Sequence, residues 1–169
     1  MIEIRNERPH NSEHFSRLLA FYRDIVPVCH DLHITPLLSG SLAVFAYTRN
    51  QMMRVNDLDL ACSESAFPRL GDALAAQGMA FEVKAWHVLQ VRRDGVKVEF
   101  DSIEYWFAGV PTDSDTLIID ECAFNVVGLS SLRELYRCGL EEGARRRDAA
   151  SRAKDAAIAE KYALLRAVE

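Results

Sequence analysis

The sequence predicts an α+β protein in which helices flank a mixed β-sheet. Apolar residues recur at three- and four-residue spacing in some segments, which indicates amphipathic helices, and alternate with polar residues in others, which indicates strands. These segments follow one another as helix, strand, helix, strand, helix, several strands and then helices. Such an order is typical of a sheet that helices cover.

The first helix is expected to begin at Asn11 or Ser12, because either side chain can cap its free N–H groups. Its apolar residues between Phe15 and Val26 share one face, which indicates one buried stripe. Pro27 has no backbone N–H, so it is expected to kink or end this helix.

A short buried strand is expected over residues 34–38, with Pro36 at its start or on a sheet edge. The small residues Ser39-Gly40-Ser41 end this strand and lead into a short helix over 42–47. The later elements follow from the same two periodicities and from turn residues. They are a strand over 57–62, a helix over 63–77, strands over 80–84, 87–92 and 96–103 with a hairpin turn at Arg93-Asp94-Gly95, a strand over 122–127, and helices over 130–143 and 149–168.

With 169 residues, 49% of them hydrophobic, the whole chain is expected to form one domain. We expect an α/β core over about residues 12–128 and C-terminal helices over about 129–169. The formal charge of −5 argues against a nucleic-acid or anionic-membrane binder, which normally has a basic excess.

We expect neither a membrane span nor an export signal. No stretch approaches the about 18 uninterrupted apolar residues of a membrane helix, and the charged N-terminus lacks an apolar signal core. We therefore expect a cytoplasmic protein. Its cysteines form no Cys-x-x-Cys pair, so reduced and buried thiols are expected at Cys29, Cys62, Cys122 and Cys138.

The Gly40-Ser41 turn leaves a predicted strand and opens a predicted helix. Backbone N–H groups at such a turn can approach a phosphate closely, and the start of a helix adds partial positive charge. Because Gly-Ser is also a common loop dipeptide, the turn by itself indicates little.

Asp57 and Asp59 are two residues apart on a predicted strand and therefore point to the same face. Two carboxylates so placed repel each other unless a cation lies between them, and such a pair suits Mg²⁺. The alternative is a solvated strand end.

The strand predicted over 96–103 places Glu99 and Asp101 on one face and apolar residues on the other. If this strand lies beside the strand of Asp57, one of the two acids completes a cluster of three carboxylates. Three carboxylates can hold two metal ions, which is the arrangement used for phosphoryl or nucleotidyl transfer.

Gly40-Ser41, fifteen intervening residues, Asp57-Leu58-Asp59 and a later strand acid together resemble the motif of the nucleotidyltransferase superfamily that includes DNA polymerase beta. The long spacer, with Arg54 shortly before the acids, is most similar to the small bacterial lincosamide and aminoglycoside nucleotidyltransferases. The resemblance covers roughly residues 12–168. Segments similar to the family's terminal helices are Leu132–Tyr136, Lys154–Ile158 and Leu164-Leu165.

The resemblance implies a role for each motif residue. Gly40 and Ser41 would bind the phosphates of a nucleoside triphosphate, and Asp57 and Asp59 would hold one or two Mg²⁺ ions. The third acid would deprotonate the acceptor hydroxyl or hold the second ion. Glu99 is favoured as this third acid, ligating metal as well, because it lies in a Val-acid-hydrophobic step. Asp101 is the alternative because it shares the same face.

Other residues carry two interpretations. Lys154 offers a positive charge to the phosphates, or it is a solvated helix lysine. The Arg145–Arg147 run is a patch for a phosphorylated ligand, or it is a solvated loop. Tyr105 and Trp106 could stack on a base or on an acceptor ring, but we favour a place in the core for them.

We therefore expect an Mg²⁺-dependent enzyme that moves a nucleoside monophosphate from an NTP, with ATP among the candidates, to a hydroxyl of a small molecule or a protein. The acidic charge makes an RNA end the least favoured acceptor, and a homodimer could complete the acceptor site. A second hypothesis is a non-catalytic protein of the same fold, such as the nucleotidyltransferase member of a toxin–antitoxin pair. A third is that the acids are structural and the fold binds an unrelated ligand.

Overall fold

The computed structural model describes residues 1–143 and 149–169. Its centre is an eight-stranded mixed sheet with the strand order β1-β7-β8-β2-β3-β6-β5-β4. The strands are β1 (Ile2–Ile4), β2 (Leu37–Ser39), β3 (Asp57–Cys62), β4 (Ala80–Lys84), β5 (Val88–Arg93), β6 (Val96–Ser102), β7 (Ser114–Ile119) and β8 (Cys122–Val127). The helices are α1 (Ser12–Asp31), α2 (Gly40–Thr48), the 3₁₀ turn η1 (Glu64–Ala66), α3 (Phe67–Ala76), α4 (Ile103–Trp106), α5 (Leu129–Gly143) and α6 (Ala149–Arg166).

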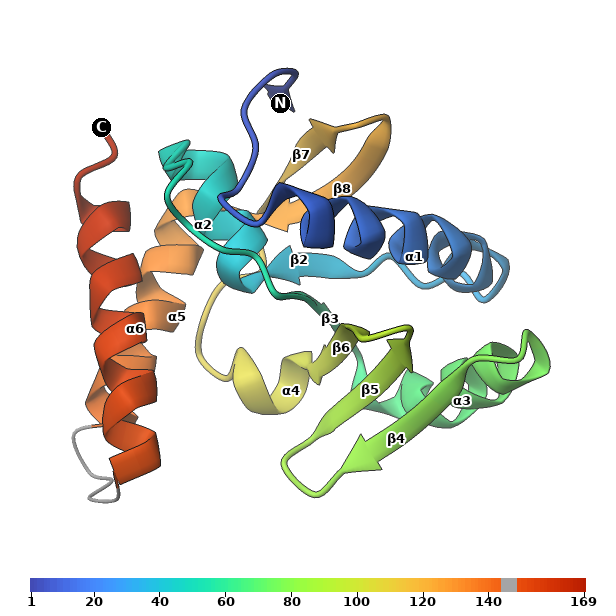
Figure 1. Cartoon of the computed structure of the whole chain (residues 1–169). Coiled ribbons are helices and arrows are strands. Elements are labelled where there is room, and N and C mark those ends of the chain that lie inside the picture. The colour runs from blue at the N-terminus through green and yellow to red at the C-terminus, as the bar shows by residue number, and fades with distance from the viewer. Residues whose placement is uncertain (144–148) are drawn as a thin grey trace.

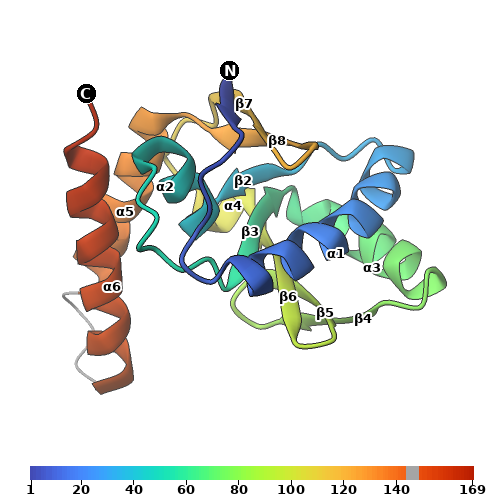
Figure 2. The same cartoon turned by 45° about the horizontal axis from the view of Figure 1, so that its top comes forward.

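The helices form two groups around this sheet. α1 and α3 pack against strands and against each other. Figure 1 shows α5 and α6 as an antiparallel pair at the other side of the molecule, and α2 contacts both this pair and the strands. Figure 2 shows the same separation of α5 and α6 from α1 and α3. The α+β prediction, with a mixed sheet and C-terminal helices, is confirmed.

The two strands that carry the predicted acids lie side by side in the middle of the sheet. β3 and β6 run parallel, with Asp57 opposite Lys97 and Asp59 opposite Glu99. Residues that alternate with these acids, including Leu58, are fully buried in the core. Because side chains alternate along a strand, burial of the apolar set fixes the acids on the opposite face.

The first helix begins at Ser12, as predicted, but it does not end at Pro27 and Asn11 does not cap it through its side chain. α1 continues through Pro27 to Asp31, because burial of Val28 and Cys29 holds the helix together beyond the missing hydrogen bond. Asn11 precedes α1 but does not cap it with its side chain. Its amide instead bonds the backbone of Val55, at 2.8 Å to the carbonyl and 2.9 Å to the N–H, and so ties the start of α1 to the segment before β3.

Several predicted bounds change where a residue has a special backbone. The strand expected over 34–38 is β2, which starts after Pro36. The helix expected over 63–77 divides into η1 and α3, because Pro68 favours the first turn of a new helix. His87 has a φ of +64° and lies in a turn, so β5 begins one residue later than expected.

The short strands β1 and β7 and the one-turn helix α4 were not predicted. β7 pairs with β8 in the antiparallel sense and with β1 in the parallel sense. Cys29, Cys62 and Cys122 are buried free thiols, as predicted, whereas Cys138 is half-buried. Among the described residues, no helix combines the length and the apolar character that crossing a bilayer requires.

Candidate active site

The turn from β2 into α2 brings Gly40 directly against Asp59. Gly40 has a φ of +64°, and a Cβ placed on it would lie 2.8 Å from the Asp59 Cβ and closer still to the carboxylate. A larger residue would therefore be strained and would also displace the acid. The small-residue turn is thus what lets a carboxylate of β3 reach the start of α2.

Three carboxylates meet at this point. Asp57, Asp59 and Glu99 each present an oxygen, and these oxygens all lie within 4.8 Å of one another. The cluster follows from the register of β3 on β6, since Asp59 stands opposite Glu99. Several hard oxygen atoms around one point are the donor set that Mg²⁺ prefers, so the residues present fit this ion.

Asp101 lies next to the cluster but is not one of its three members. It follows Glu99 on the same face of β6, stands opposite Ala61 of β3, and lines the same cavity. Burial, with the negative charges of Asp59 and Glu99, raises its pKa well above the usual range of an aspartate. Of the two acids left open by the sequence, the geometry brings Glu99 into the cluster.

Asp59 lies between the other two acids of the cluster and the start of α2. Burial raises its pKa to about 7, and the nearby charges of Asp57 and Glu99 act in the same direction. A carboxylate in such surroundings is stabilised by any cation that comes close to it.

Lys97 supplies a positive charge at the cluster. Its Nζ lies 3.1 Å from Asp57 Oδ2 and also pairs with Glu99 Oε1. Partial burial opposes the charged form, but the bonds to Glu99 and Asp57 outweigh it and raise the pKa of Lys97. Sequence reasoning missed this residue, although its place two residues before Glu99 puts it on the same strand face.

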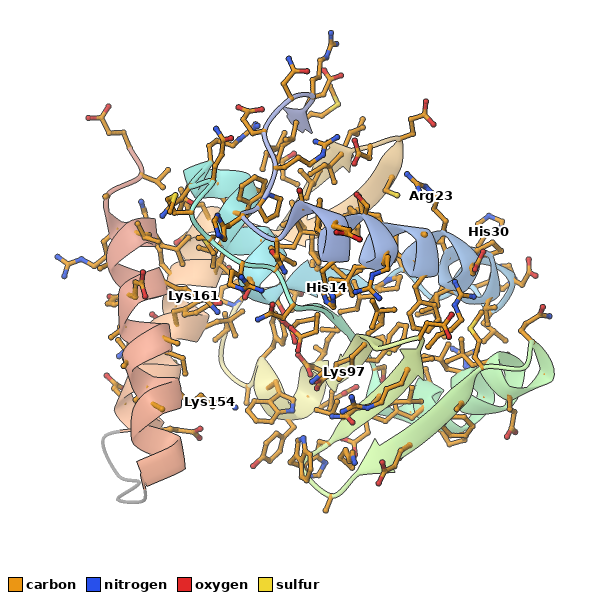
Figure 3. The ribbon with its side chains drawn as sticks, in the orientation of Figure 1. His14, Arg23, His30, Lys97, Lys154 and Lys161 are labelled. Carbon is orange, nitrogen blue, oxygen red and sulfur yellow. The ribbon has the colours of Figure 1, made fainter. Side chains whose placement is uncertain are left out.

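Two lysines of α6 face the cluster from the other side. Lys161 Nζ donates a hydrogen bond to Ser41 Oγ at 2.8 Å, and Lys154 lines the same cavity. Figure 3 shows both side chains on α6 and Lys97 on the sheet side of this space. Lys161 was also missed, although it lies two helical turns after Lys154, on the same face. The predicted arginine patch, Arg145–Arg147, lies outside the described residues.

The cavity between these groups has a volume of about 390 Å³. Besides the acids and lysines, aromatic side chains line it: Trp86, Trp106 and Tyr136. An adjoining chamber of about 260 Å³ shares Asp59, Asp101 and Lys154 with this cavity and is otherwise lined mainly by apolar residues, among them Leu132 and Leu135 of α5. The cavity therefore joins a charged end to an apolar end.

The expectation that Tyr105 and Trp106 close the core is wrong. Tyr105 is 53% exposed and Trp106 is 36% exposed, because α4 lies at the rim of the cavity rather than inside the sheet packing. The Trp106 indole N–H donates to the backbone carbonyl of Trp86 at 3.1 Å. This bond joins two aromatic residues of the cavity wall.

Solved structures of other proteins share this architecture. The chain superposes on ANT(2")-Ia in complex with adenylyl-2"-tobramycin with a TM-score of 0.59, at 11% identity and over 86% of both chains. Lincomycin-bound LnuA, a lincosamide antibiotic adenylyltransferase, gives a TM-score of 0.53 at 11% identity, over 89% of this chain and 96% of that one. An antigenic nucleotidyltransferase-like protein from Paracoccidioides brasiliensis gives 0.56 at 13% identity, over 92% of this chain and 76% of that one.

The likeness to these proteins lies in the fold. No protein-family model matches the sequence, and no curated protein matches it. The superpositions nevertheless cover at least 86% of each chain. The chain therefore has a nucleotidyltransferase fold, as its motif implied.

Proposed function

We propose that the protein is a Mg²⁺-dependent nucleotidyltransferase that moves a nucleoside monophosphate from an NTP to a hydroxyl group. The observation that carries this proposal is the convergence of Asp57, Asp59 and Glu99 beside a cavity that also holds Ser41 and Lys161. Carboxylates for a metal and cationic groups for phosphates are the two requirements of such a transfer, and here they face each other.

The acidic cluster would hold the metal through Asp57, Asp59 and Glu99. When bound, Mg²⁺ would supply a Lewis acid that offsets the charge of the phosphates and makes the acceptor hydroxyl easier to deprotonate. Gly40 keeps the Asp59 carboxylate at the start of α2, where the phosphates would also bind. The chain thus would hold the metal and the phosphates in one place.

The triphosphate would lie between the start of α2 and α6. Gly40 and Ser41 would offer their backbone N–H groups there, the Ser41 hydroxyl accepts a hydrogen bond from Lys161, and Lys161 and Lys154 add two ammonium groups to the same cavity. Such groups bind phosphate oxygens by charge-assisted hydrogen bonds. They would orient the α-phosphorus towards the acids.

Glu99 is the residue we propose as the proton acceptor. The acceptor hydroxyl would pass its proton to the Glu99 carboxylate, its oxygen would form a bond to the α-phosphorus, and pyrophosphate would leave. Asp101 would be the second acid on this face of β6, two residues after Glu99.

The acceptor would be a small molecule that carries a ring. Trp86, Trp106 and Tyr136 offer flat surfaces beside the acids, and the adjoining chamber is largely apolar. The structural neighbours that hold adenylyl-2"-tobramycin and lincomycin support an acceptor of this kind.

A transfer assay tests this function. The purified protein is incubated with each of the four NTPs, labelled at the α-phosphate, with Mg²⁺ and a panel of hydroxyl compounds and proteins. We expect a labelled product and pyrophosphate, both absent in the Asp57→Asn/Asp59→Asn variant. Intact Mg²⁺–NTP binding without transfer to any acceptor would instead favour the non-catalytic partner.

A further inference from the structure

Lys97 places an ammonium group where a divalent cation would meet the carboxylates. Its Nζ contacts Asp57 at 3.1 Å and also pairs with Glu99. These two acids are members of the same three-carboxylate cluster. The chain therefore supplies a monovalent cation to two of the three carboxylates that would hold a metal.

An ammonium and a divalent cation cannot share these oxygens without strong repulsion. At separations of a few ångströms, like charges repel strongly where protein surrounds them. The Lys97 N–H groups are also directed at the same carboxylate groups. A metal among the three acids would therefore compete with the Lys97 ammonium for Asp57 and Glu99.

Phosphates bound in the same cavity would give a displaced Lys97 a new partner. Three of the four lysines of the chain line it: Lys97, Lys154 and Lys161. Lys97 is 24% exposed, and its four-carbon stem lets the ammonium turn away from the strand. Bound phosphates would place negative oxygens within this space.

We propose that Lys97 is a built-in counter-cation of the acidic cluster, which a divalent metal displaces and which the triphosphate of the nucleotide then takes up. This inference rests on the proposed function. Its consequence is cooperativity: metal alone must displace Lys97 without compensation, whereas metal with nucleotide gives the ammonium a new ion pair. The two ligands therefore strengthen each other's binding by the same factor.

A variant series with Mn²⁺ as the probe measures this coupling. In Lys97→Met, Mn²⁺ alone should bind about tenfold more tightly than in the wild type, within the roughly 5- to 150-fold range usual for coupled sites. The strengthening of ATP binding by Mn²⁺ should shrink by a similar factor. Lys97→Arg keeps the charge and should stay near the wild type. Lys84→Met removes the same charge from β4, where Lys84 pairs with Glu82, and should change neither affinity.

Lysine labelling tests the same inference in the unaltered protein. At low doses of acetic anhydride, Lys97 should be protected without metal, labelled faster with saturating Mn²⁺, and protected again when a non-hydrolysable ATP analogue is added. Lys84 should label equally in all three states. This measurement decides the matter even if Lys97→Met does not fold.

The outcomes separate this inference from the proposed function. Unchanged or weaker Mn²⁺ affinity in a folded Lys97→Met variant, or Lys97 labelling that ignores Mn²⁺, overturns the inference and leaves the metal site in place. Failure of Mn²⁺ to bind either protein, with or without ATP, overturns the proposed function and the inference with it.

Discussion

The carboxylate of Asp59 lies directly against Gly40, at the point where β2 turns into α2. Gly40 meets two demands there, a positive φ and the absence of a side chain. The contact joins the two halves of the proposed site, since the metal-binding acids lie on one side of it and the phosphate-binding turn on the other.

Replacing Gly40 should destabilise the protein at the contact between the acids and the phosphate-binding turn. We expect Gly40→Ala to lower the free energy of unfolding by about 3 kcal/mol, because the left-handed backbone and the overlap with Asp59 each add to the cost. Gly95→Ala is the matched control, because Gly95 also has a positive φ but a Cβ placed on it would have no neighbour within 4 Å. It should cost about 1 kcal/mol in the same urea titration. Equal losses in the two variants would contradict the close approach of Asp59.

The raised pKa of Asp59 predicts that the stability of the metal-free protein depends on pH. The pKa of Asp59 is raised from 3.8 to about 7 by burial and by its acidic neighbours. The folded state therefore binds more protons than the unfolded state, and stability from this group is lost as the pH rises from 3.8 to about 7.

Asp59→Asn removes this dependence, because an amide does not ionise. In EDTA, the melting temperature of the wild type should fall relative to that of Asp59→Asn as the pH rises through this window. The variant should be the more stable protein at pH 8. Melting curves that run parallel at all pH values would speak against a buried, repelled carboxyl at Asp59.

Lys161 should contribute to nucleotide binding. Its ammonium bonds Ser41 at 2.8 Å and lines the cavity in which the triphosphate would lie. Loss of one charge-assisted bond to phosphate should weaken Mg²⁺–ATP binding about tenfold in Lys161→Met. Calorimetric titration measures this change, with Lys84→Met as the control for overall charge. An unchanged dissociation constant would remove Lys161 from the site.

Tryptophan fluorescence should report directly on the cavity. The chain has two tryptophans, and both Trp86 and Trp106 line this space. A ligand that stacks on Trp106 should quench much of the tryptophan emission and should shield the remaining emission from quenching by iodide. The Trp106→Phe variant should lose most of this ligand-induced change in emission. Nucleotide or acceptor binding that leaves the emission untouched would place the ligand elsewhere.

The acid pair could be predicted from the sequence because alternation on one strand is a local property. Asp57 and Asp59 alternate with buried leucines, so their shared face follows from the strand itself. The third acid depends on the register between β3 and β6, which tertiary packing sets. The sequence therefore favoured Glu99 but kept Asp101 as the alternative, and the pairing of Asp59 with Glu99 brings Glu99 into the cluster.

The residues that sequence reasoning missed depend on distant contacts. Lys161 lies on a helix at the surface. Its role in the proposed site follows from its hydrogen bond to Ser41, which is 120 residues away in the chain. β7 begins with the polar residues Ser114, Asp115 and Thr116, so it has little alternation of its own, and pairing with β8 and β1 makes it a strand. Local patterns do not contain this information.

The central claim is that the carboxylate cluster holds the metal that nucleotide binding requires. Calorimetric titration with ATP, GTP, CTP and UTP, each with and without Mg²⁺, tests it most directly in the wild type and in Asp57→Asn/Asp59→Asn. We expect at least one NTP to bind only with Mg²⁺, and the double variant to lose this binding while remaining folded by circular dichroism. Equal NTP binding by both proteins, or no binding by the wild type under any condition, would contradict the claim.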